Sequence, residues 1–230
     1  MEYIHNTEQF QFHNTVVALG KFDGMHKGHQ LIFDELIQYK QLGYQAAVFS
    51  FDRPPLNMLK HKHMRVIYTT NEKIKLLARR GIDIYIEHPF TDEFSHLSPE
   101  DFVIKVLLEK TGMKVLVVGD DCGFGYKRQG NVELLERMSK EYDFKLIVIP
   151  KLELEGEIVS STRIRHLLSE GKVEEANRLM EDPFMICGSV VHGNHMGAEV
   201  LQMPTANQIP LEDKLLPPNG VYVSRIHYKD

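Results

Sequence analysis

The sequence is poor in cysteine and contains no tryptophan; Cys122 and Cys187 are its two cysteines in 230 residues. Two cysteines cannot build the disulfide framework of a small secreted domain, so we expect a reduced, cytoplasmic setting. No apolar run approaches the ~20 residues that a helix needs to cross a bilayer. Residues 1–5 also lack the basic segment that opens a signal peptide. These absences predict a protein that does not act at a membrane.

The charge pattern and one missing motif disfavour two further classes of protein. The formal net charge is −5, and 27 basic and 32 acidic residues are interspersed along the chain. Such a mixed, slightly acidic surface argues against a general nucleic-acid binder. The phosphate loop Gly-x-x-x-x-Gly-Lys-Ser/Thr is absent, so we do not expect a P-loop kinase or GTPase. No pattern in the sequence predicts an oligomeric state.

Expected strands alternate with expected helices over the first two thirds of the sequence. Apolar, β-branched runs begin about thirty residues apart, which is the length of a βαβ unit. We expect strands at 16–19, 46–51, 82–86, 115–118 and 146–149, and helices at 29–39, 71–80, 99–110 and 131–141. The alternation predicts an α/β fold: a Rossmann-like domain with a five-stranded parallel sheet, which binds ligands beyond the carboxyl ends of its strands.

The pattern changes after Asp182. Before this point we expect a polar loop at 151–157 and helices at 160–168 and 173–180. After it we expect strands at 186–191 and 221–226. The last two are separated by glycine, proline and asparagine, which is typical of a β-rich segment. We therefore predict one domain at 1–182 and the beginning of a second, β-rich module at 183–230.

Residues 20–29 form the most informative motif. They read Gly-Lys-Phe-Asp-Gly-Met-His-Lys-Gly-His and connect an expected strand to an expected helix. Backbone N–H groups and the helix dipole favour an anion at such a connection. His26 and His29 are three residues apart, so both fall on one face of the first helical turn. Solvated surface histidines or zinc ligands are alternatives, but neither explains the glycine-rich turn, and zinc needs further ligands.

A second candidate anion site lies at the expected start of a later helix. Ser160, Ser161 and Thr162 stand there, and Arg165 follows one turn on. Hydroxyl groups, a helix N-terminus and an arginine can together hold a phosphate group. The alternative is a plain serine N-cap followed by surface arginines.

Two more polar stretches follow expected strands. Residues 119–130 hold four glycines in twelve positions, which predicts a tight loop near a ligand or, alternatively, an ordinary loop. Carboxylates of this loop could bind ribose hydroxyls, and Phe124 or Tyr126 could stack on a ring. Residues 51–55 read Phe-Asp-Arg-Pro-Pro, a rigid turn for which a structural and a substrate-lining role are equally open.

Together these motifs resemble those of the prokaryotic FAD synthetase family, the bifunctional riboflavin kinase/FMN adenylyltransferases. Residues 20–30 are similar to the family's Gly-x-Phe-Asp-Gly-x-His-x-Gly-His-Gln, and residues 160–165 to its Ser-Ser-Thr-x-Ile-Arg. Four motifs occur in the family's order over roughly the first 180 residues, which makes the resemblance specific.

The other two motifs depart from the family at named positions. Residues 119–130 resemble the loop Gly-x-Asp-Phe-x-Phe-Gly-x-x-Arg-x-Gly, with departures at Cys122 and Gly123. Residues 51–55 resemble Phe-x-Pro-His-Pro, with departures at Arg53 and Pro54. Both departures fall on stretches that the resemblance assigns to the flavin.

Residues 188–207 resemble the opening of the family's riboflavin kinase module. Its ATP–Mg motif Pro-Thr-Ala-Asn places Thr205 and Asn207 at matching positions. The later barrel strands and the catalytic glutamate of that module are absent from this sequence. We therefore expect a partial β-barrel with exposed sheet edges, and no kinase activity from the chain as given.

The resemblance implies an FMN adenylyltransferase, which transfers AMP from ATP to FMN to give FAD and pyrophosphate. Mg²⁺ is implied as an ion bound by the ATP phosphates, with no protein ligand assigned. The implied catalytic residues are His26 and His29 at the triphosphate, and Ser161, Thr162 and Arg165 at the departing pyrophosphate. The implied ATP site adds Gly20, Phe22, Asp23, Gly24, Gly28, Asp121 and Ser160, and the implied FMN site comprises Phe51, Pro54, Asp121, Phe124, Gly125 and Arg128.

Two alternative functions share part of this pattern. A nucleotidyltransferase with another acceptor, such as nicotinamide mononucleotide or phosphopantetheine, would have the same histidine and Ser-Ser-Thr motifs. A catalytically idle regulator that binds flavin or nucleotide is suggested by the incomplete kinase-like segment and by the departures on the flavin side. The intact phosphate-binding residues favour the enzyme over the regulator.

Overall fold

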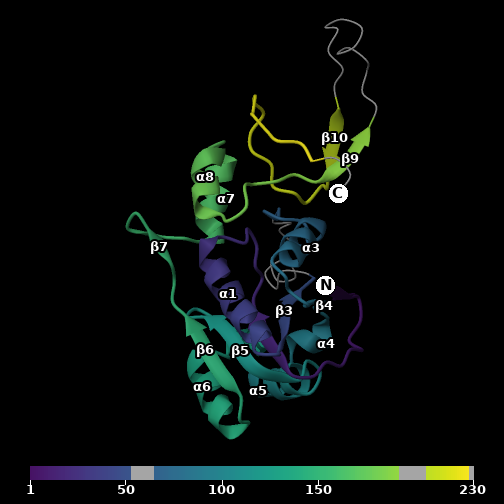
Figure 1. The fold of residues 1–230 in the computed structure, drawn as a ribbon, viewed down its shortest axis with the longest axis vertical. Helices are drawn as coiled ribbons and strands as arrows, with labels where there is room; N and C mark the ends of the chain where they lie inside the picture. The colour runs from purple at the N-terminus through teal and green to yellow at the C-terminus, as the bar shows by residue number, and fades with distance from the viewer. Residues whose placement is uncertain (53–64, 192–205, 228–230) are drawn as a thin grey trace, which may run out of the picture.

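A sheet of parallel strands forms the centre of the fold (Figure 1). The structure, a computed structural model, describes residues 1–52, 65–191 and 206–227. The strands of the sheet are β1 (Glu2–His5), β2 (Thr15–Leu19), β3 (Gln45–Phe51), β4 (Ile84–His88), β5 (Met113–Gly119) and β6 (Lys145–Ile149). Their order is β1-β4-β3-β2-β5-β6, and all neighbouring pairs are parallel. The predicted α/β fold is confirmed, with six strands in the sheet instead of the expected five.

The additional strand is β1, which pairs with β4 at the edge of the sheet. It has four residues, of which Glu2 and His5 are exposed. A short edge strand with polar ends lacks the apolar run that marks a buried parallel strand, so the pattern gave no signal for it. A small hairpin of β7 (Glu153–Leu154) and β8 (Glu157–Ile158) also occupies part of the expected loop.

Helices cover both faces of the sheet. They are α1 (Lys27–Gln41), α3 (Thr70–Arg79), α4 (Asp92–Ser95), α5 (Pro99–Asp101), the π-helix η1 (Phe102–Leu108), the 3₁₀-helix η2 (Tyr126–Arg128), α6 (Val132–Glu141), α7 (Ser161–Ser169) and α8 (Val173–Leu179). All six predicted helices are present within two residues of their expected bounds, although the one at 99–110 consists of α5 followed by η1. Side chains of Thr69, Asn131 and Ser160 cap three of them by accepting a backbone hydrogen bond, which fixes where each begins.

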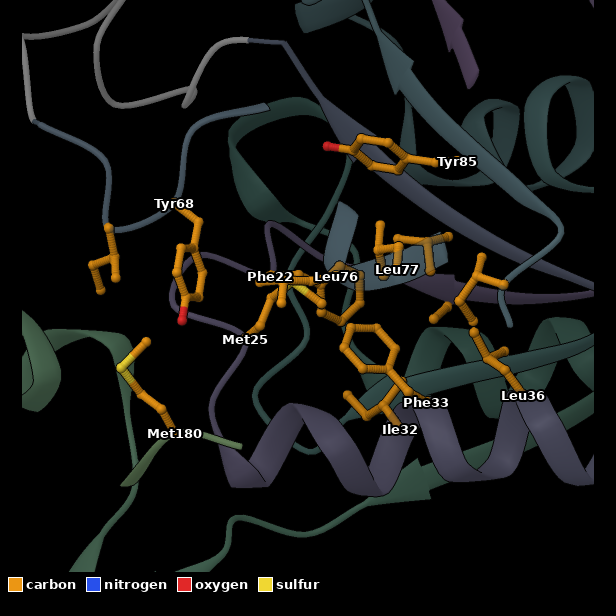
Figure 2. Close-up of a cluster of buried hydrophobic side chains, with 14 of the residues drawn as sticks. Phe22, Met25, Ile32, Phe33, Leu36, Tyr68, Leu76, Leu77, Tyr85 and Met180 are labelled. Carbon is orange, nitrogen blue, oxygen red and sulfur yellow. The ribbon is translucent and has the colours of Figure 1, made fainter. Parts of the chain in front are cut away.

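Alternate residues of the central strands enter two separate hydrophobic clusters. In β2, Val16 and Ala18 belong to the cluster that contains Phe33 of α1, whereas Val17 belongs to the cluster that contains Phe102 of η1. Figure 2 shows side chains of α1 and α3 meeting in the first cluster. Side chains alternate across a strand, so a strand covered on both faces is apolar at every position.

The described part of the chain after α8 contains one pair of short strands, which differs in part from the expectation. β9 (Gly188–Val191) and β10 (Asn207–Pro210) form an antiparallel pair beyond α3 (Figure 1). The strand predicted at 221–226 is wrong, because these residues have no strand pairing and the side chains of Val221 and Val223 are fully exposed. A β-branched run becomes a strand only where a partner completes its ladder of hydrogen bonds. The domain boundary after residue 182 stays a prediction.

We expect Phe33→Ala to lower the free energy of unfolding by about 3–5 kcal/mol, because it leaves a cavity in the first cluster. Phe33 is fully buried, and its ring centroid lies 5.0 Å from that of Phe22. Leu31 is an exposed residue of the same helix, so Leu31→Ala is a matched control that should change stability by less than about 0.5 kcal/mol. Urea denaturation measures both variants, and equal losses would contradict this placement of α1.

Candidate functional site

The candidate site lies where the strand order of the sheet reverses. The chain runs from β2 to β3 and β4 on one side of β2, and then to β5 on its other side. Ligands of open α/β sheets bind at this point, beyond the carboxyl ends of the strands. Residues 20–26 follow β2 and residues 119–130 follow β5, so the topology places two of the predicted motifs next to each other. The motif at residues 160–165 lies at the start of α7 and is hydrogen-bonded to the motif at residues 20–29.

His26 and His29 stack on each other at the start of α1. Their ring centroids lie 3.6 Å apart with 17° between the ring planes. His26 is the N-cap of the helix, and its Nδ1 accepts a hydrogen bond from the backbone N–H of His29 at 3.3 Å. His26 is buried and His29 is half-buried. The two rings therefore lie together on the first turn, as the spacing predicts, and they are not freely solvated.

Burial keeps both imidazoles neutral. It lowers the pKa of His26 to about 4, although the negative charge of Asp121 opposes this shift. Burial also lowers the pKa of His29 well below its usual value, and the neighbouring His26 lowers it further. Because Nδ1 of His26 accepts a hydrogen bond, the single proton of its neutral ring is assigned to Nε2. That N–H can donate to a phosphate oxygen at neutral pH without bringing a positive charge.

Phe22, Gly20 and Gly28 support the histidine pair. Phe22 is 3% exposed, and its ring packs edge-on against His29 with centroids 5.2 Å apart. A Cβ atom at Gly20 would lie 2.9 Å from the ring of Phe22, and one at Gly28 would lie 3.2 Å from Nδ1 of His26. Both glycines are therefore needed for the close approach of these rings. The structure places Phe22, an implied ATP residue, in the core, where it orients His29.

Asp23 links the first motif to the rest of the site. Its Oδ1 accepts hydrogen bonds from the backbone N–H groups of Ile67 at 2.9 Å and Tyr68 at 3.4 Å. Its Oδ2 forms an ion pair with Arg165, and its backbone carbonyl accepts a hydrogen bond from the hydroxyl of Ser161. Three segments that are distant in sequence thus meet at one aspartate.

Gly24, the residue after this aspartate, has a φ of +84° and a position where a Cβ atom would come within 3.1 Å of Ile67. A left-handed backbone in a tight space favours glycine. Gly24 therefore allows the loop to turn closely against the segment that Asp23 binds.

The start of α7 supplies the second predicted anion site. Ser160 is the N-cap and accepts a hydrogen bond from the N–H of Arg163 at 3.2 Å, while Thr162 is exposed. Arg165 donates to the backbone carbonyl of Arg65 as well as to Asp23. These contacts occupy two of the five N–H groups of a guanidinium, and the side chain of Arg165 is 22% exposed.

The loop after β5 is anchored to the core. Phe124 and Gly130 exchange two backbone hydrogen bonds of 3.1 and 2.9 Å. The ring of Phe124 is 6% exposed and lies 5.8 Å from that of Phe102, so it packs inward. Gly125 has a φ of +68°, and a Cβ atom there would lie 2.7 Å from Pro99. These two implied FMN residues thus fix the shape of the loop.

Charged side chains of the two loops interact with one another and with neighbouring segments. Asp121 forms an exposed ion pair with Lys151 at 3.2 Å. The pKa of Lys21 is lowered, first by partial burial of its ammonium group and then by the positive charges of Arg128 and Arg165. Lys21 therefore lies close enough to both arginines for their charges to act on it, and such a group of cations suits an anion. Lys21 is absent from the predicted site residues, although its place directly after β2 was a signal for it.

The remaining predicted flavin residues divide between described and undescribed parts of the chain. Phe51 ends β3 among aromatic rings, with centroids 5.4 Å from Phe90 and 5.7 Å from Phe94. It is half-buried. Arg53 and Pro54 lie outside the described residues. An aromatic group therefore stands near the carboxyl edge of the sheet, as a flavin site would need.

The described ranges contain neither a ready-made metal site nor a membrane helix. No three His, Cys, Asp or Glu side chains gather within them as metal ligands would, so the histidine pair has no further protein ligand there of the kind that zinc uses. None of their helices is both long and apolar enough to cross a membrane.

Cys122 and Cys187 are free thiols, and burial raises the pKa of Cys122 to about 11.

The fold and the groups suited to phosphate define a nucleotidyltransferase of the doubly wound α/β class. The sequence model of the FAD synthetase family matches residues 8–163, and the chain belongs to this family. The riboflavin kinase model matches residues 180–230. In that part, Asn207 is exposed on β10 and Thr205 lies outside the described residues. The match of the FAD synthetase model to residues 8–163 confirms the predicted family.

Named relatives are similar to the chain along nearly all of its length. The bifunctional riboflavin kinase/FMN adenylyltransferase of Buchnera aphidicola subsp. Schizaphis graminum is 38% identical over 226 residues, covering 97% of this chain and 72% of that protein. The Escherichia coli K12 protein of the same name is 32% identical over 225 residues, covering 97% and 71%. A crystal structure titled as a macrolide-efflux protein from Streptococcus pneumoniae has a TM-score of 0.83 at 31% identity, covering 96% of this chain and 72% of that one.

We expect the free energy of unfolding to fall between pH 7.5 and pH 5, in part because of His26. The pKa of His26 is about 4 in the folded chain and 6.5 in the unfolded one, so the unfolded chain binds more protons in this range. The contribution of this one group is about 2 kcal/mol. Asn also caps helices, so the His26→Asn variant should keep its helix cap. Between these two pH values, its free energy of unfolding should fall by about 2 kcal/mol less than that of the wild type, as measured by urea denaturation. Parallel losses in the two proteins would show that His26 is not buried in neutral form.

Proposed function

We propose that the chain makes FAD at the site between residues 20–29, residues 119–130 and the start of α7. An oxygen of the FMN phosphate attacks the α-phosphorus of ATP, the bond from that phosphorus to the β-phosphate oxygen breaks, and pyrophosphate leaves. The observation that carries the proposal is the stacked, neutral pair of His26 and His29 in the motif that Asp23 links to Arg165. Membership of the FAD synthetase family supports ATP and FMN as the substrates.

The two histidines are proposed to act as neutral donors. Each neutral imidazole carries one N–H group, which can bond to an oxygen of the triphosphate. Donors that are already held in place stabilise the charge that develops on phosphate oxygens without having to reorganise. Catalysis then depends on positioning and charge stabilisation, with no covalent intermediate on the protein.

The pyrophosphate end is assigned to the start of α7. Thr162 and Arg165 would bind the β- and γ-phosphates together with the backbone N–H groups of the helix N-terminus. Ser161 would help to place this helix, because its hydroxyl is bonded to the carbonyl of Asp23. Lys21 would add a second positively charged side chain, beside Arg165, to this end of the site. Mg²⁺ would arrive with the phosphate oxygens of ATP, which are the hard ligands that it prefers.

The flavin is assigned to the side of the loop after β5. Arg128 is exposed there and can meet the FMN phosphate, while Asp121 can accept hydrogen bonds from ribose hydroxyls. Phe51 stands with other aromatic rings at the end of β3, where a flavin ring could pack. We also propose that the chain works in the cytoplasm, since reducing conditions there keep cysteines as thiols.

His29→Ala is expected to lower the turnover number for FAD formation by ~10²-fold, the scale of losing one preorganised donor at a transition state. His166→Ala is the matched control, because His166 is exposed on α7 and paired with Glu170. Release of pyrophosphate and formation of FAD are measured together at saturating ATP and FMN. An unchanged turnover in folded His29→Ala protein would remove this residue from the mechanism.

Among FMN, nicotinamide mononucleotide and phosphopantetheine, we expect FMN alone to give pyrophosphate with ATP and Mg²⁺. The aromatic rings near the end of β3 suit a flavin better than the smaller acceptors. Pyrophosphate release is followed with each acceptor under the same conditions. Turnover with another acceptor would favour a different nucleotidyltransferase, and binding of FMN and ATP without any release would favour the idle regulator.

A further inference from the structure

A buried ion pair joins two distant parts of the chain. Nζ of Lys214 lies 2.6 Å from Oε2 of Glu72, and the two side chains are 1% and 0% exposed. Glu72 belongs to the first turn of α3, whereas Lys214 follows β10 in the part that matches the riboflavin kinase model. The pair thus holds the C-terminal part of the chain against the FAD synthetase part.

Backbone groups complete the hydrogen bonding of this pair. Lys214 Nζ also donates to the carbonyl of Ile67 at 2.6 Å. Glu72 accepts from the backbone N–H groups of Thr69 at 2.8 Å and Cys187 at 2.7 Å. A well-satisfied buried ion pair adds little stability over apolar residues of similar volume. The role of this ion pair is therefore to hold a segment of backbone in place.

That backbone is the segment of residues 65–69. The N–H of Val66 donates to the carbonyl of Asp213 at 2.7 Å, and the N–H of Leu215 donates to the carbonyl of Val66 at 2.7 Å. Together with the bond from Lys214, these contacts attach three consecutive C-terminal residues to the segment. Residues 65–69 are thus held in part by residues that lie outside the FAD synthetase part.

The same segment is also bonded to residues of the candidate site. The N–H of Ile67 donates to Asp23 at 2.9 Å, and the carbonyl of Arg65 accepts a hydrogen bond from Arg165. Figure 2 shows Tyr68 of this segment beside Met25 of the first motif. Ile67 therefore bonds to Asp23 through its N–H and to Lys214 through its carbonyl. One peptide segment separates the buried lysine from the ion pair of Asp23 and Arg165.

We propose that Lys214 and Glu72 are positioning residues for Arg165, so that AMP transfer depends on the C-terminal residues 213–215 being docked on residues 65–69. The proposal rests on the proposed function of Arg165 at the β- and γ-phosphates. When Lys214 is docked, the carbonyl of Arg65 and the carboxylate of Asp23 hold the guanidinium at the start of α7. When it is not, the segment shifts and both acceptors of Arg165 move with it.

The test is a double-mutant cycle on the full 230-residue chain, with FAD formation measured at varied ATP and varied FMN. Lys214→Met keeps the aliphatic stem and removes the charge, and we expect kcat/KM for ATP to fall about 10-fold while KM for FMN changes less than about 2-fold. Lys75→Met is the control, since Lys75 is exposed on the same helix as Glu72. It should behave as the wild type.

The decisive readout is the effect of Lys214→Met in an Arg165→Met background. If Lys214 acts through Arg165, adding Lys214→Met to the Arg165→Met variant lowers kcat/KM for ATP by less than about a further 2-fold. A full additional 10-fold loss, or no loss from Lys214→Met alone, overturns the inference while the proposed function stands. A wild-type chain that makes no FAD overturns both.

A second variant keeps the test valid if Lys214→Met fails to fold. Removing one partner leaves a buried unpaired charge, whereas Glu72→Gln with Lys214→Met removes both charges. This double variant should fold and still lose about 10-fold in kcat/KM for ATP. Wild-type kinetics in the folded double variant would show that the pair has no positioning role.

Discussion

The carboxylate of Asp23 is the constraint on which the arrangement of the site depends. It bonds to the backbone of residues 67 and 68 through one oxygen and to Arg165 through the other, while its own carbonyl holds Ser161. A carboxylate offers two oxygens with several acceptor positions, so a single residue can orient several donors at once. The strand–turn–helix motif and the start of α7 become one site because they share this residue.

Burial sets the chemistry of the same site. Phe22 belongs to the core cluster shown in Figure 2 and also contacts the ring of His29, so the packing that stabilises α1 extends to the histidine pair. The same burial lowers the pKa values of both histidines and makes them neutral donors. Positive charge comes instead from the side chain of Lys21 and from Arg128 and Arg165, whose charges lower the pKa of Lys21.

Much of this fold could be predicted, because parallel strands buried on both faces appear as apolar runs and helices carry their caps in the sequence. The elements that prediction missed depend on partners. β1 is a strand because β4 offers an edge, and residues 221–226 are not a strand because they have no partner within the described chain. The histidine pair was predictable from its spacing, whereas its neutrality was not, because burial is a property of the assembled core.

The sequence by itself determined the α/β class, the strand–turn–helix motif at residues 20–29 and its three companion motifs, since each depends on residues close together in the chain. Tertiary structure alone decided that Asp23 would bind Arg165, that Phe22 would support His29, and that Lys214 would be buried against Glu72. Such contacts join residues far apart in sequence, and no local pattern records which distant partner a charged or aromatic side chain will meet.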